Sequence, residues 1–179
     1  MGDMNALAQI DLDRNEAGGL GGSSPRVSQV VLRRAQREDV PALVALIAAD
    51  QLGATRDGIR DAADLESYEA AFAAMDADPA HILLVAESAG AVVGTMQLSF
   101  LPGLARRGAL RAQIEAVRVA ESTRGSGLGA AMMQWAIDEA RRRGCALVQL
   151  TSDKSRTDAH RFYQRLGFVS SHEGMKLKL

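Results

Sequence analysis

The sequence predicts an α/β domain built around one mixed sheet. Short apolar runs with the alternation of strands are interspersed with segments of helical periodicity. Two such runs are separated only by the turn Ser88-Ala89-Gly90, which predicts a hairpin. A length of 179 residues with 47% apolar residues is typical of a single domain with one hydrophobic core.

Residues 1–29 are expected to form a flexible N-terminal tail. The run Ala17–Pro25 is rich in glycine and serine and has too little apolar surface to offset the entropy of ordering. The domain is therefore expected to cover residues 30–179, and it opens with a short strand at Val30-Val31-Leu32.

Two helices are expected next. Asp39 is a candidate N-cap, with Pro41 in the first turn of the first helix. A second helix ends before Pro79. Their apolar faces carry, in turn, Leu43, Leu46 and Ile47, then Leu65, Tyr68, Phe72 and Met75.

Three strands should follow these helices. Ile82–Ala86 and Ala91–Phe100 form the hairpin, and Gln113–Val119 forms the third strand. The loop between the second and third strands begins at Pro102-Gly103 and carries Arg106, Arg107 and Arg111.

The remaining elements alternate again. A long helix over Leu128–Arg143 ends at Gly144, and Ala146–Leu150 is a strand. Ser155-Arg156-Thr157-Asp158 has the pattern of a capping box, which opens a further helix that Gly167 ends. Two closing strands are expected at Phe168-Val169 and Met175–Leu179.

The overall composition argues against several classes of protein. A net charge of -1 gives no general attraction to nucleic acid or to an anionic membrane. No apolar run reaches the roughly 20 residues that span a bilayer, and the N-terminus lacks a secretory signal. Cys145 is the one cysteine, so no internal disulfide can form, and the three histidines show no metal-ligand spacing. We therefore expect a cytoplasmic protein without a metal.

The most informative stretch runs from Val117 to Gly129. It leads from a strand through a glycine-rich turn into the N-terminus of a long helix. Free backbone N–H groups and the helix dipole make such a terminus an anion site, and glycines let a pyrophosphate approach the main chain. Arg124 adds a positive charge. These features predict a phosphorylated ligand.

A dinucleotide-binding motif is one interpretation of this stretch, because Gly125-x-Gly127-x-x-Ala130 fits G-x-G-x-x-A and Asp153 follows at a strand end. However, Ala120–Arg124 separate the first glycine from its strand, and no second βαβαβ half follows. This interpretation is therefore disfavoured.

The motifs resemble those of the GNAT superfamily of acyl-CoA-dependent acyltransferases. Arg124-x-x-Gly127-x-Gly129 matches its Q/R-x-x-G-x-G/A signature, and Ala159–Phe168 is similar to its A-x-x-F-Y-x-x-x-G-F helix and strand. Both motifs occur in the right order, and the resemblance covers about Val30 to Leu179. It implies the GNAT fold, a single mixed, mostly antiparallel sheet flanked by helices.

The resemblance also implies acetyl-CoA as co-substrate. In this family the backbone around Val117, Arg118 and Val119 would pair with the pantetheine arm, as an added strand does. The loop and first helical turn would hold the pyrophosphate, and their residues are Arg124, Gly125, Ser126, Gly127, Leu128, Gly129 and Ala130. Arg156 departs from the family, which often has asparagine at this place.

Acetyl transfer to an amine needs a base and an acid. Glu115 is the candidate base, because it shares strand parity with Val117 and should point to the same side. A merely solvated or salt-bridged glutamate is the alternative. The resemblance implies Tyr163 as the general acid for the leaving thiolate.

The acceptor is less defined. The stretch from Arg156 to Tyr163 is similar to the aminoalkylphosphonate N-acetyltransferase branch, which implies a primary amine of a small molecule. Acceptors of this class include amino acids and aminoalkylphosphonates, and the counter-charges for an anionic acceptor would be Arg106, Arg107, Arg111 or Arg156. Acetylation of a protein N-terminus or lysine, a CoA-binding module without catalysis, and a homodimer all stay open.

Overall fold

One six-stranded sheet organises the chain. The computed structural model describes residues 6–10, 29–50 and 53–178. The strands lie in chain order: β1 (Ala6–Ile10), β2 (Val30–Arg34), β3 (His81–Ser88), β4 (Ala91–Leu101), β5 (Arg111–Val119) and β6 (Leu147–Leu150). All neighbouring pairs are antiparallel except β5 and β6, which are parallel. The mixed, mostly antiparallel sheet expected from the sequence is confirmed.

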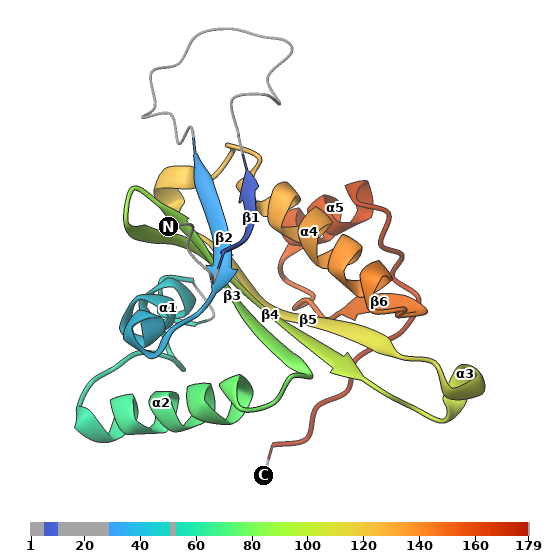
Figure 1. Ribbon diagram of the computed structural model, residues 1–179, viewed down its shortest axis with the longest axis horizontal. Helices are drawn as coiled ribbons and strands as arrows, with labels where there is room; N and C mark the ends of the chain where they lie inside the picture. The colour runs from blue at the N-terminus through green and yellow to red at the C-terminus, as the bar shows by residue number, and fades with distance from the viewer. Residues whose placement is uncertain (1–5, 11–28, 51–52, 179) are drawn as a thin grey trace, which may run out of the picture.

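Helices cover both faces of this sheet (Figure 1). α1 (Val40–Ala48) and α2 (Ala62–Asp76) lie on one side, and α4 (Leu128–Arg142) and α5 (Thr157–Arg165) lie on the other. Short helical turns, η2 (Arg37–Asp39), α3 (Ala105–Gly108) and η3 (Glu121–Thr123), connect the longer elements. No helix in the described part of the chain is long and apolar enough to cross a membrane.

Each helical layer buries its own apolar cluster against the sheet. The larger cluster joins Met132, Met133 and Ala136 of α4 to the strand side chains that face them. The smaller one joins α1 and α2, through Leu43 and Phe72, to the opposite face. The sheet is therefore buried on both sides, and the helices hold their ends at fixed places along it.

The first strand lies within the segment expected to be a flexible tail, and for these residues that expectation is wrong. Ala6–Ile10 pairs antiparallel with β2, and Ala8 and Ile10 pack against the larger cluster. Five residues form no strand alone, but the edge of a preformed sheet supplies the missing partner. The folded domain includes this strand, and the rest of the expected tail lies outside the described residues.

The two closing strands expected near the C-terminus are not formed in residues 166–178. Val169, Met175 and Leu177 are 81%, 92% and 88% exposed. Alternating apolar residues make a strand only where a partner edge and an apolar surface receive them, and these side chains meet neither. Leu179 lies outside the described residues.

Two expected caps use their side chains elsewhere. Asp39 immediately precedes α1, but its carboxylate accepts hydrogen bonds of 2.7 and 2.8 Å from Arg33. The residue before α5 is Arg156 and not Ser155, whose hydroxyl donates to Asp153 instead. The helices begin within about one residue of their predicted starts all the same.

Candidate active site

β5 contains one more residue than β4 at the centre of their pairing. Gln97 of β4 pairs with Glu115, and Thr95 pairs with Arg118. One residue of β4 therefore faces two of β5, Ala116 and Val117, which is a β-bulge. Ala116 has φ of 51°, in the left-handed region that non-glycine residues rarely adopt, so the backbone is strained at this point.

The bulge reverses the alternation of side chains along β5. Val117 and Val119 pack against the same cluster as Ile114, whereas Glu115 is exposed and lies on the opposite face. The expectation that Glu115 and Val117 point to the same side is therefore wrong. Instead, Glu115 shares its face with Arg118.

Beyond Ile114, β5 has a free edge. β6 pairs with β5 only from Arg111↔Leu147 to Ile114↔Leu150, while β5 continues to Val119. Among the described residues, no strand pairs with this last part of β5 on the β6 side. Its backbone N–H and C=O groups can therefore accept an extended ligand as an added strand.

The glycine-rich loop leads from this free edge to α4. Gly125 and Gly127 have φ of 80° and 84°, which glycine adopts without strain, and a Cβ built on either would meet no atom within 4 Å. Gly127 precedes α4, and the N–H of Leu128 donates to the Ser126 hydroxyl oxygen at 3.4 Å. The next N–H groups, those of Gly129 and Ala130, are available to an anion. Ser126 donates its hydroxyl to the Thr123 carbonyl at 2.7 Å, so that side chain supports the loop.

α5 packs beside the same edge. A Cβ built on Gly129, in the first turn of α4, would lie 3.7 Å from Phe162 of α5 and 3.7 Å from Val119 of β5. The end of β5, the start of α4 and α5 therefore converge on one place. The sequence-predicted cofactor residues, from Val117 to Ala130, lie together there.

Tyr163 is half-buried on α5. Its ring contacts Phe162 and Phe168 edge-on, with centroids 5.2 and 6.0 Å away. Burial raises the pKa of the Tyr163 phenol, and the charges of Arg118 and Arg156 oppose that rise only in part. The phenol is therefore protonated at neutral pH, as a proton donor must be.

A charged cluster beside Tyr163 was not anticipated. Asp50, just beyond α1, accepts a hydrogen bond from Arg156 and lies 3.7 Å from Arg118. The sequence singled out Arg156 as a departure from its family pattern, but it gave no signal for Asp50. That residue is 106 positions from Arg156, and only the packing of α1 against the sheet brings the two together.

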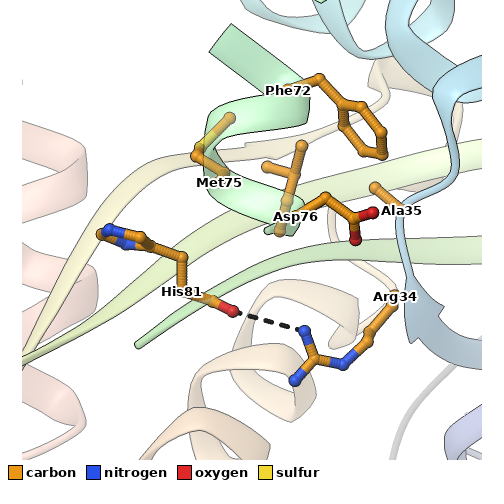
Figure 2. A pocket seen from close by; sticks show the side chains of 7 residues that line it. Arg34, Ala35, Phe72, Met75, Asp76 and His81 are labelled. Atoms are coloured by element: carbon orange, nitrogen blue, oxygen red, sulfur yellow. Dashed lines mark hydrogen bonds between the residues drawn. The ribbon is translucent and has the colours of Figure 1, made fainter. Parts of the chain in front are cut away.

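A separate pocket lies between α2 and the start of β3 (Figure 2). Its volume is about 10 Å³, which suits at most one water molecule. Arg34 donates to the carbonyl oxygen of His81 at 3.3 Å beside it. None of the predicted site residues lines this pocket, and it is too small for an acceptor.

Comparison with known proteins decides the family. Residues 44–168 match the model of the Acetyltransferase (GNAT) family. The chain belongs to the GNAT acetyltransferase family. It is 32% identical to the aminoalkylphosphonate N-acetyltransferase of Salmonella typhimurium over 141 residues, 79% of this chain and 86% of the relative.

Solved structures share the fold of this chain. A Bacillus halodurans protein described as a transcriptional regulator superposes with a TM-score of 0.80 at 41% identity, over 84% of this chain and 99% of the other. A Clostridium acetobutylicum protein described as a predicted acetyltransferase, solved with acetyl-CoA, superposes with a TM-score of 0.66 at 20% identity, over 83% of this chain and 96% of the other. At 20% identity, the second structure shows only that the two chains share a fold.

This GNAT protein is an acetyl-CoA-dependent N-acetyltransferase. Its own residues fit that co-substrate. The free edge of β5 suits an amide-bearing arm, and the open glycine loop before α4 suits a pyrophosphate. Acetyl-CoA supplies the thioester for the reaction.

Proposed function

We propose that this GNAT enzyme acetylates a primary amine of a small molecule, by direct attack of the amine on the thioester of acetyl-CoA. The convergence of the free edge of β5 with the glycine loop and Tyr163 carries this proposal. The relative from Salmonella typhimurium supports it, since aminoalkylphosphonates are small primary amines.

Backbone atoms provide most of the proposed co-substrate contacts. The main chain of Val117, Arg118 and Val119 pairs with the pantetheine arm. Within the range from Gly125 to Ala130, the amides of Ser126 and Leu128 donate inside the loop, and the remaining amides hold the pyrophosphate. Exposed Arg124 adds charge at the mouth of the site. Arg118 contributes here through its backbone, because its side chain is directed to Asp50.

Two side chains carry the proposed proton transfers. Glu115 takes a proton from the amine, directly or through one water, so that nitrogen can bond to the acetyl carbon. A backbone N–H near Val117 polarises the carbonyl as the carbon–sulfur bond breaks. Tyr163 gives its proton to the departing thiolate, which leaves an amide and a free thiol.

A panel of acceptors tests the acceptor class. Purified protein is incubated with acetyl-CoA and aminoalkylphosphonates, amino acids, polyamines or aminoglycosides, alongside peptides with a free N-terminus or lysine. Mass spectrometry should detect N-acetyl products of small amines, with kcat/KM well above that of any peptide. A higher kcat/KM for peptides would replace the proposal with protein acetylation.

A further inference from the structure

Three charged side chains from distant parts of the chain meet beside Tyr163. Asp50 follows α1, Arg118 lies on β5, and Arg156 directly precedes α5. Arg156 donates through Nη2 to Oδ2 of Asp50, and Nη2 of Arg118 lies 3.7 Å from the same oxygen. Two guanidinium groups therefore share one carboxylate.

This cluster is positively charged and largely withdrawn from water. The side chains of Arg118, Asp50 and Arg156 are only 20%, 19% and 27% exposed. Burial lowers the pKa of Arg118, and the positive charge of Arg156 lowers it further, while Asp50 and, more weakly, Tyr163 and Asp57 oppose these effects. Two guanidiniums against the single carboxylate that they contact leave an excess positive charge, which attracts an anion strongly where water screens it little.

Arg118 also has hydrogen-bonding capacity that its neighbours do not use. Its Nη1 donates to the carbonyl oxygen of Val117 at 2.8 Å. Its Nε is buried without a hydrogen-bond partner among the described residues, and its Nη2 is too far from Asp50 for a hydrogen bond. Nη2 is therefore the donor that Arg118 can offer to an oxyanion, while the buried Nε is covered by the surrounding protein.

The bulge in β5 sets how far this cluster lies from the proposed base. Glu115 is opposite Gln97 and Arg118 is opposite Thr95, so the two are separated by two residues of β4. That separation is about 7 Å along a strand, and both side chains lie on the same face. A molecule that spans the two positions would carry its amine and its acidic group only a few atoms apart.

We propose that Arg118 and Arg156 bind an acidic group of the acceptor, and that Asp50 holds the two guanidiniums in place for it. The substrate class is then small primary amines that carry a carboxylate, phosphonate or phosphate. This inference rests on the proposed function and specifies its acceptor.

The geometry also excludes three arginines suggested by the sequence. Arg106 and Arg107 lie in α3, at the far tip of the β4–β5 hairpin (Figure 1). Arg111 begins β5, seven residues and about 23 Å of strand before Arg118. These side chains are too distant to bind the same small molecule, so Arg156 alone remains from that set.

Substitution of Arg156 tests the site. With saturating acetyl-CoA, kcat/KM is measured for 2-aminoethylphosphonate, β-alanine and β-alaninamide, which has an amide in place of the acidic group. The proteins compared are wild type, Arg156→Gln and Arg165→Gln. Arg165 is an exposed arginine of α5 and gives a matched control. Arg156→Gln should lower the preference for the acids over the amide by about tenfold to a hundredfold, chiefly through KM, as loss of a charge-assisted hydrogen bond does.

The three amines differ in basicity, but this difference is the same for every variant. Comparing the ratio of kcat/KM for the acids to that for the amide between variants therefore cancels it. Arg156→Lys, which keeps the charge but not the fork, should recover part of the preference. Equal losses for the acids and the amide, or equal losses in Arg156→Gln and Arg165→Gln, would contradict the proposal. Circular dichroism confirms that each variant is folded.

Binding without catalysis separates this inference from the proposed function. Calorimetry on CoA-saturated protein uses ethylphosphonate, propionate and propionamide, none of which has an amine. If an acid binds to the wild type and Arg156→Gln weakens that binding, the site is supported even if no amine is acetylated. Whichever of ethylphosphonate and propionate binds more tightly shows whether the site prefers a phosphonate or a carboxylate. If neither acid binds better than propionamide while small amines are acetylated, the site is refuted and the function stands.

Discussion

Glu115 and Val117 are two residues apart on β5, yet their side chains lie on opposite faces of the sheet. The bulge at Ala116 causes this by inserting one residue between their pairing positions. Val117 consequently packs into the core, while exposed Glu115 lies on the same face as Arg118. The proposed base and the proposed anion site therefore face the same side, and one small acceptor can contact both.

Glu115→Gln tests the proposed base. The amide keeps the shape of the side chain but accepts no proton, so kcat/KM at neutral pH should fall by roughly 10²-fold. The loss should shrink as rising pH deprotonates the free amine. The measurement is the pH profile of kcat/KM, with Glu66→Gln on α2 as control.

Parallel profiles of equal height would rule out any role for Glu115 in catalysis. A drop of the same size at every pH would show instead that Glu115 positions the acceptor without taking its proton.

Tyr163→Phe tests the proposed acid. The substitution removes one hydroxyl and retains the ring contacts with Phe162 and Phe168. We expect kcat to fall by roughly 10²-fold with little change in affinity for acetyl-CoA. Tyr68→Phe, at the chain's other tyrosine, should leave kcat almost unchanged. Equal kcat for Tyr163→Phe and wild type, where chemistry limits the rate, would leave Tyr163 a packing residue.

Gly127→Glu tests the pyrophosphate site. Acetyl-CoA should raise the Tm of the wild type by mass action, and NAD should not. A glutamate at Gly127 brings a side chain and a negative charge to the loop, so the acetyl-CoA shift should disappear.

Gly144→Glu is the matched control, because a glutamate there also puts a non-glycine residue at a positive φ and strains the backbone. Gly144 has φ of 75°, close to the 84° of Gly127, and also faces open space, but it lies at the other end of α4. Both variants should lose similar stability, and only Gly144→Glu should retain the acetyl-CoA shift. If Gly127→Glu retains the Tm shift with acetyl-CoA, the phosphates of acetyl-CoA do not bind at this loop.

Asp39→Asn tests the contact at the start of α1, the helix that Asp50 follows. Burial would raise the pKa of the Asp39 carboxyl, but hydrogen bonds from Arg33 and from the Gln36 backbone hold it below its ordinary value. The side chains of Arg33 and Asp39 are each only 10% exposed. Asp39→Asn should therefore lower the free energy of unfolding by roughly 3 kcal/mol, because it leaves a buried guanidinium without its carboxylate. Asp138→Asn, which breaks an exposed pair, should cost less than about 1 kcal/mol.

The pH dependence follows from the lowered pKa. The contribution of Asp39 is complete above its unfolded-state pKa of about 4 and is lost as pH falls through the lower folded-state value. The Tm difference between wild type and Asp39→Asn should therefore narrow below about pH 4. A difference that stays constant down to pH 3 would show that the carboxylate charge is not what stabilises this contact.

Local patterns predicted most of the elements and the co-substrate loop. The turn at Ala89-Gly90, the helix that begins at Leu128 and the stop at Gly167 all depend on residues adjacent in sequence, so periodicity and glycine positions were sufficient. The second motif also placed Tyr163 correctly on α5.

Features that depend on tertiary pairing were missed. The short strand Ala6–Ile10 exists because β2 offers it an edge, and the alternating C-terminal residues form no strand because nothing receives them. The face of Glu115 depends on a bulge for which Ala116 gives no local signal. Asp50 reaches Arg156 only through the relative placement of α1 and α5.

Release of the CoA thiol, measured together with N-acetylated product, tests the central claim most directly. A small primary amine with an acidic group is added to protein and acetyl-CoA, and thiol and product are quantified over time. We predict that thiol release depends on the amine and yields one N-acetyl product per thiol. Thiol release at the same rate without the amine, or with no N-acetylated amine formed, would contradict the account.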